Sequence, residues 1–177
     1  LVALFSVAEA DMVFISRHGI APLAAVSCSL PLIGLTYVIG LGFEAGAASC
    51  VSCAVGKGDP GRALSLSTDT MTLAVISALM LTLAGLLTRA PVFSLLGATP
   101  ELMPLIHDYM GTWYWVVPLD MALWTTLATI RARGNTLFES KVITAAAVLN
   151  LVLDPILIFG LLGAPALGVK GAALATV

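Results

Sequence analysis

Charged residues are scarce in this chain of 177 residues. Lys, Arg, Asp and Glu together make up 10% of it, whereas a soluble domain usually carries ~25%. Hydrophobic residues make up 59%, and the mean hydropathy is +1.05. A surface with so few charges cannot keep such an apolar chain dissolved in water. The composition therefore excludes an ordinary soluble domain and indicates a membrane protein.

Concentrated positive charge is also absent. The chain has 8 Lys and Arg against 10 Asp and Glu, and no basic patch, which argues against nucleic-acid binding. No basic segment precedes the first apolar stretch, and Glu9 and Asp11 lie within it, so this stretch does not fit a signal peptide. The chain begins at Leu1 and stops at Val177 within an apolar run, and we expect it to be a fragment of a longer protein.

Cysteine is limited to Cys28, Cys50 and Cys53, of which the last two form a C-x-x-C pattern. A structural zinc site needs four ligands, and no second ligand pair lies nearby in the sequence. A reactive thiol needs a cation or a helix N-terminus beside it, and neither is indicated here. We interpret the three cysteines as small packing residues rather than a metal or redox site.

Long apolar stretches separated by short polar turns are what the chain does contain. Six segments have membrane length, although the first and the last are cut short: residues 1–16, 21–55, 62–87, 101–130, 142–162 and from 167 onward. Polar or Gly/Pro-rich breaks separate them at residues 17–19, 56–61, 89–100 and 131–135. The sequence therefore predicts an all-α, polytopic membrane helix bundle of about six transmembrane helices.

Lys and Arg in the predicted loops indicate the orientation of this bundle. If the N-terminus faces the cytoplasm, the cytoplasmic loops hold five cations and the opposite loops hold three, which favours this orientation. We expect a multi-pass protein of the inner (plasma) membrane. Gly42 and Gly46 form a G-x-x-x-G pair, which predicts close helix packing in the second segment.

Five of the ten acidic residues lie at membrane depth in the predicted spans: Glu9, Asp11, Glu44, Asp120 and Asp154. The other five lie in a turn, at a helix start or near the interface, and every Lys and Arg lies near a span end. An ionisable group at membrane depth costs at least ~2.5–3.5 kcal/mol by insertion scales, so each is a candidate functional residue. Without a basic partner, such a carboxyl group can hold a proton near neutral pH or bind a cation.

Asp154 is the strongest of these candidates, because Asn150 lies one helical turn earlier on the same face. Together they place a carboxylate and an amide inside an apolar helix, although Asp154 also precedes Pro155 and could cap a restarted turn. Glu44 and Asp120 could line a cavity or satisfy backbone groups freed by neighbouring Gly and Pro. Trp115, with its aromatic neighbours, could belong to an interfacial belt or line a cavity.

Three groups of residues resemble the N-terminal lobe of the multidrug and toxic compound extrusion (MATE) transporters. The order and spacing of these stretches hold over nearly the whole chain: Ala10–Ser16, Gly19 and Pro22–Val26; Gly40–Gly42, Gly46–Ser49 and Gly56–Ala63; and Arg131–Thr136, Leu149–Pro155 and Gly168–Thr176. The sequence departs from the family pattern at Glu44, where the residue is usually small or polar, and at Phe138–Ser140, where a proline-containing turn is more usual.

The resemblance implies that residues 1–177 form one lobe of a two-lobe transporter, with a second lobe expected in the same chain. It implies export of amphipathic, often cationic small molecules across the lipid bilayer in exchange for H+ or Na+. It implies no enzymatic activity, and no cofactor or metal beyond the coupling ion. Residues similar to the family's cation site are Asp11, Asn150, Asp154 and Thr176, with Glu44, Asp120 and Trp115 as possible cavity residues.

Three alternatives remain beside this interpretation. A lipid-linked oligosaccharide flippase of the same superfamily is one, although acidic rather than basic residues at membrane depth favour a cationic cargo. An intramembrane aspartyl protease using Asp120 and Asp154 is disfavoured, because neither lies in a recognised catalytic helix context. Finally, the 177 residues on their own are expected to be inactive, because one lobe cannot open alternately to the two sides of the membrane without the second lobe.

Overall fold

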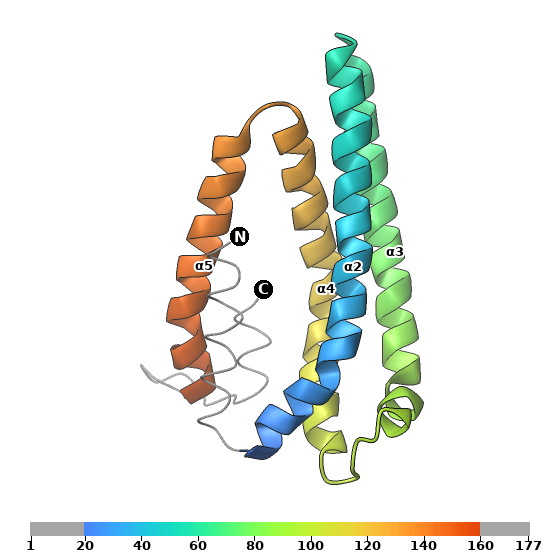
Figure 1. Cartoon of the computed structure of the whole chain (residues 1–177), viewed down its shortest axis with the longest axis vertical. Coiled ribbons are helices and arrows are strands. Elements are labelled where there is room, and N and C mark those ends of the chain that lie inside the picture. Colours follow the sequence, from blue (N-terminus) through green and yellow to red (C-terminus); the bar gives the residue numbers. More distant parts are fainter. Residues whose placement is uncertain (1–19, 160–177) are drawn as a thin grey trace. The chain divides into compact units, whose positions relative to one another are not determined.

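The computed structural model describes residues 20–159, and this part of the chain consists of helices and short turns (Figure 1). The helices are α2 (Ile20–Gly56), α3 (Pro60–Leu95), α4 (Met103–Ala132) and α5 (Thr136–Phe159). No strand occurs among these residues, so the predicted all-α class is confirmed. The predicted first and last segments lie outside the described residues.

Three of the described helices are long and apolar enough to cross a membrane: α2, α3 and the Thr136–Leu153 part of α5. Helix α4 has 30 residues, which is also long enough to cross. His107, Asp108 and Asp120 interrupt its apolar sequence, and it contains no stretch as apolar as those of the other three helices. The predicted fourth segment is thus a helix, as expected.

Two predicted helix ends are wrong. Helix α3 continues through Arg89 and Pro91 to Leu95, where the sequence predicted a break. A proline inside a helix frees one backbone carbonyl, whereas ending the helix in an apolar environment would expose several, so the helix continues. Helix α5 begins at Thr136, earlier than the predicted residue 142, because the Asn135 side chain caps it by accepting a hydrogen bond from the Phe138 N–H at 3.2 Å.

The connections after α2, α3 and α4 use the same reversal. Each has a glycine in the left-handed region: Gly58, Gly97 and Gly134, with φ of 71°, 83° and 92°. In each, the N–H following that glycine donates to a carbonyl five residues back, at 3.1 Å, 3.0 Å and 3.3 Å. This is the hydrogen-bond pattern of a Schellman cap, which only glycine adopts without steric cost.

The chain divides into two compact units, and each described helix contributes to both. The described part of unit 1 contains residues 20–31, 85–114 and 142–159, and unit 2 contains residues 32–84 and 115–141. In unit 1, the largest fully buried side chains are Phe93, Ile106 and Met110. In unit 2, a small cluster joins three helices through residues with short side chains: Val51, Ala54 and Ala63, with Leu66 and Ala132 packed against them.

Close helix approach occurs at glycines other than the predicted pair. A Cβ atom at Gly42 or Gly46 would meet nothing within 4 Å, so the described residues give no close packing at the G-x-x-x-G motif. At Gly85, by contrast, a Cβ atom would lie 2.3 Å from the ring of Tyr114 within unit 1. Gly85 therefore lets α3 and α4 approach to a distance that any other residue would prevent.

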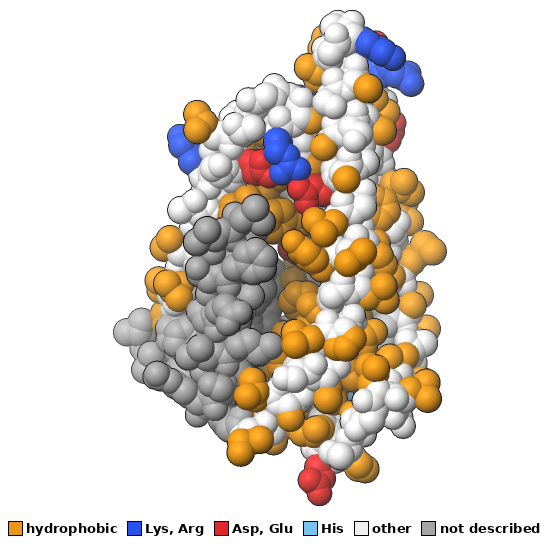
Figure 2. All heavy atoms as spheres, in the orientation of Figure 1, with side chains coloured by type: hydrophobic (Ala, Val, Ile, Leu, Met, Phe, Trp, Pro, Cys, Tyr) orange, Lys and Arg blue, Asp and Glu red, His pale blue; other side chains and the backbone are white. Residues whose placement is uncertain are grey.

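Large apolar side chains lie exposed along α3, including Leu73, Ile76, Met80 and Leu83. Figure 2 shows such side chains along this helix on the visible face. A water-facing surface of this kind would be costly, whereas lipid tails solvate it well. The exposed surface of α3 is therefore suited to contact with the bilayer.

Candidate functional site

Helix α5 carries the two predicted cation-site residues that fall within the described range. Asn150 and Asp154 are four residues apart in one continuous helix, which places them on the same face, as predicted. The Asn150 side chain is buried, with 7% of its surface exposed. The side chain of Asp154 is not among those described.

The amide oxygen of Asn150 is buried and accepts no hydrogen bond from the part of the chain that the structure describes. A buried acceptor without a donor costs about 1–3 kcal/mol. A proton-bearing group, a water molecule or a cation bound to this oxygen would remove that cost. The chemistry of Asn150 therefore fits a cation ligand.

The other two predicted ligands, Asp11 and Thr176, lie outside the described residues. Their convergence with Asn150 and Asp154 thus stays a prediction. Among the side chains that the structure describes, which do not include that of Asp154, no group of three or more His, Cys, Asp or Glu is arranged to hold a metal ion. Cys50 and Cys53 are free and exposed, and Cys28 is free and half-buried.

Asp120 and Trp115, two of the possible cavity residues, lie in α4. The indole N–H of Trp124 donates to Oδ1 of Asp120 at 2.8 Å, one turn along the same helix. Trp115 is 68% exposed, so the described residues do not enclose its side chain. A role for either residue in a transport cavity stays a prediction.

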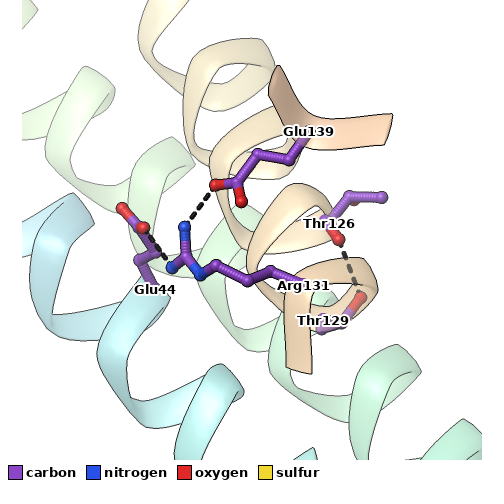
Figure 3. A network of polar contacts seen from close by, with 5 residues as sticks. All are labelled: Glu44, Thr126, Thr129, Arg131 and Glu139. Atoms are coloured by element: carbon purple, nitrogen blue, oxygen red, sulfur yellow. Dashed lines mark hydrogen bonds and ion pairs between the residues drawn. The ribbon is translucent and has the colours of Figure 1, made fainter. Parts of the chain in front are cut away.

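Glu44, the third possible cavity residue, has a basic partner. Nη2 of Arg131 donates to Oε1 of Glu44 at 2.6 Å, and Nη1 of the same guanidinium donates to Oε1 of Glu139 (Figure 3). The expectation that the acids within the spans lack basic partners is therefore wrong for Glu44. The reason is tertiary: the last turn of α4 lies beside α2, which brings together residues 87 positions apart.

The Arg131 network (Glu44, Arg131 and Glu139) joins α2, α4 and α5 within unit 2. The side chains of Glu44 and Glu139 are only 19% and 10% exposed, and that of Arg131 is 36% exposed. Hydrogen bonding to Glu44 raises the pKa of Arg131 further above its usual value. Arg131 therefore stays charged as the pH rises, and only strong alkali would remove the proton on which these contacts depend.

Both carboxylates are departures from the family pattern, Glu44 by itself and Glu139 within Phe138–Ser140, and the sequence does not relate them to each other. The structure shows that one guanidinium binds both. Arg131 was seen only as part of a loop motif, and no sequence pattern connects it with Glu44. Gly85 was also missed, because one glycine in an apolar helix gives no signal of a packed aromatic ring.

Long helices with apolar, lipid-compatible surfaces and a buried amide on α5 define a polytopic helical membrane protein. The MatE family profile matches residues 1–156. The chain belongs to this family, the MATE transporters, as the resemblance implied.

Solved structures and curated proteins agree with this assignment. The Vibrio cholerae MATE transporter VcmN in its bent form matches with a TM-score of 0.92 and 31% identity, over 99% of this chain and 39% of that one. The FAD transporter of Shewanella oneidensis is 38% identical over 94% of this chain and 37% of its own length. The multidrug export protein MepA of Staphylococcus aureus is 28% identical over 87% of this chain and 33% of its own length. The chain therefore spans between a third and two fifths of these relatives.

Proposed function

We propose that this chain is the N-terminal lobe of a secondary antiporter in the plasma membrane. The whole protein exports amphipathic or cationic small molecules in exchange for H+ or Na+. Membership of the MATE family is the observation that carries this proposal. The names of relatives such as MepA, a multidrug export protein, support the choice of cargo.

Asn150 and Asp154 provide the coupling in this proposal, together with Asp11 and Thr176. A proton or sodium ion binds among their oxygens. The amide oxygen of Asn150, which has no hydrogen-bond donor among the described residues, is a suitable ligand. Ion binding neutralises the acidic cavity, which then holds an organic cation less well and releases it. The coupling is reciprocal, because the bound compound lowers the affinity for the ion by the same factor.

Replacing Asp154 with Asn in the full-length protein tests the coupling site. Asn keeps the size of the side chain but removes the charge, so we expect ion-driven efflux from everted vesicles to be abolished while membrane insertion stays normal. Asp69→Asn is the matched control, because Asp69 is exposed on α3 and, among the described residues, accepts a side-chain hydrogen bond only from Ser65, at 3.3 Å. Normal ion-driven efflux by Asp154→Asn would refute the proposed site.

Export of a flavin dinucleotide is a second candidate function. The relative named FAD transporter is 38% identical to this chain, whereas the relatives named for multidrug export or resistance are 24–28% identical. FAD is an anion, so the acidic residues of this lobe would have to be balanced by basic residues elsewhere in the protein. A lipid-linked oligosaccharide remains a third possible cargo, and no relative described here is named for it.

Transport of two labelled compounds into everted vesicles separates the candidates. Vesicles containing the full-length protein are supplied with either an organic cation such as ethidium or with FAD, under an imposed H+ or Na+ gradient. Accumulation of ethidium supports the first proposal, and accumulation of FAD alone replaces it with the second. Imposing each gradient separately identifies the coupling ion.

A further inference from the structure

The last turn of α4 and the residues after it meet the other helices of unit 2. Arg131 binds Glu44 of α2 and Glu139 of α5, and the next residue, Ala132, packs against the small cluster formed by α2 and α3. Nη2 of Arg133 donates to Oγ of Ser67 in α3 at 2.9 Å. Three consecutive residues thus contact three different helices.

Of these three consecutive residues, Arg131 makes the ion pairs, and its two carboxylate partners are largely shielded from solvent. Two carboxylates share its single guanidinium, so the network carries one excess negative charge. Only a planar fork of donors can bind two carboxylates at once in this way, and a lysine ammonium cannot reproduce that geometry. Without Arg131, two carboxylates would lie close together with no counter-charge.

The network also lies where the apolar part of α2 ends. From Ile20 to Phe43 this helix carries no charge, which is a length of about 36 Å at 1.5 Å per residue. Glu44 is the first charged residue after that stretch. A bilayer core is ~30 Å thick, so the network lies near its edge, where ion pairs are screened less than in bulk water.

The connection between Arg131 and Glu139 is short and well bonded. Gly134 has the φ of 92° that the reversal requires, and the Asn135 side chain caps α5. Glu139 lies in the first turn of α5, and the same continuous helix carries Asn150 and Asp154. A contact that fixes Glu139 therefore restrains the start of the helix that holds the proposed coupling residues.

We propose that Arg131 is a positioning residue for transport: by binding Glu44 and Glu139 together, it keeps the start of α5 fixed to α2 within unit 2 during the access change. This inference rests on the proposed transport function. Arg131 binds neither Asn150 nor any other described residue of the proposed ion site, so we expect it to act on the rate of the conformational step rather than on ion affinity.

The first test compares efflux by variants of the full-length protein, with ethidium as the transported probe. Arg131→Met removes the guanidinium, and we expect the maximal rate to fall roughly tenfold while KM changes by less than about twofold. Arg131→Lys restores the charge without the fork and should recover part of the rate. Arg133→Gln is the matched control from the same turn. Arg133 is exposed, and the partner of its guanidinium in the described part of the chain is the hydroxyl group of Ser67, so the rate should stay near wild type.

A second variant separates positioning from a purely structural role. Breaking a buried ion pair by removing one partner destabilises a protein strongly, whereas replacing the whole network with neutral residues is often tolerated. The triple variant Glu44→Gln, Arg131→Met, Glu139→Gln should therefore recover the thermal stability and membrane yield that Arg131→Met loses. If Arg131 positions α5 for transport, the maximal rate of the triple variant stays low although its stability returns.

Recovery of both stability and rate in the triple variant would overturn the proposal, and so would a wild-type rate for Arg131→Met. Hydrogen exchange of the backbone amides at residues 134–142 gives a readout independent of cargo. It should speed up in Arg131→Met and in the triple variant, and stay unchanged in Arg133→Gln. If the wild-type protein exports neither ethidium nor FAD, the proposed transport function is refuted. Unchanged amide exchange in Arg131→Met would separately refute the role of Arg131 in fixing α5.

Discussion

At the scale of single residues, two glycines of similar sequence context have opposite surroundings. Gly85 faces the ring of Tyr114, a residue that is only 3% exposed. Gly42 has open space around the position of a Cβ atom. The cost of adding one methyl group should therefore differ in sign between these two positions.

Gly85→Ala should destabilise the protein by about 1–3 kcal/mol, because the added methyl group overlaps Tyr114 and forces the two helices apart. Thermal unfolding of the purified protein in detergent measures this effect. Gly42→Ala is the matched control, and it should be neutral or stabilise by up to about 1 kcal/mol, because alanine restricts the unfolded chain more than glycine does. A higher unfolding temperature for Gly85→Ala than for Gly42→Ala would contradict the packing of Tyr114.

At the scale of helices, α2 is longer than a membrane is thick. Its 37 residues extend about 55 Å, against ~30 Å for the hydrocarbon core. Within unit 2, the turn between α2 and α3 extends beyond the turn between α4 and α5 (Figure 1). If the charge-free stretch Ile20–Phe43 lies in the hydrocarbon core, the residues from Ala45 to Gly56 extend beyond it into water.

The native cysteines test this placement. Cys50 and Cys53 are exposed on the part of α2 beyond Glu44, whereas Cys28 lies within the charge-free stretch. A membrane-impermeant maleimide should label single-cysteine variants that retain Cys50 or Cys53, and should label Cys28 only after denaturation. With the orientation expected from the loop charges, labelling occurs in inside-out vesicles. Rapid labelling of Cys28 in intact membranes would contradict the assignment.

The extent of α2 could be predicted from the sequence because its signals are local. The predicted segment 21–55 differs by one residue at each end from the helix Ile20–Gly56, since the Gly-, Asp- and Pro-rich turn marks its end. The predicted start of α5 at residue 142 is too late, because the sequence marks only the apolar part of the helix. In the structure Asn135 caps the preceding polar residues as the first turn of α5, and Arg131, eight residues before Glu139, binds its carboxylate.

In the candidate site, too, features set by local sequence were predictable, whereas contacts between helices were not. The shared face of Asn150 and Asp154 follows from helix periodicity alone, so it was predictable. The partner of Glu44 was not, because the contact with Arg131 depends on how α2 and α4 pack rather than on either helix by itself. Long-range ion pairs leave no periodic signal in a sequence.

At the scale of the whole molecule, the chain covers 33–39% of the relatives described above. Under the proposed function, transport requires the part of those relatives that this chain does not match. The 177-residue chain alone should insert into membranes as a multi-pass protein and give no efflux above that of an empty vector. Ion-driven efflux by the chain alone would contradict a two-lobe mechanism, and the full-length protein serves as the positive control.

The glycine reversals constrain how the chain enters the bilayer during synthesis. Only Lys57, Gly58 and Asp59 separate α2 from α3, and their backbone groups are already bonded to the end of α2. So short a linker does not allow α2 to cross the membrane long before α3. We therefore expect the translocon to release α2 and α3 as a preformed hairpin, with Lys57 retained on the ribosome side.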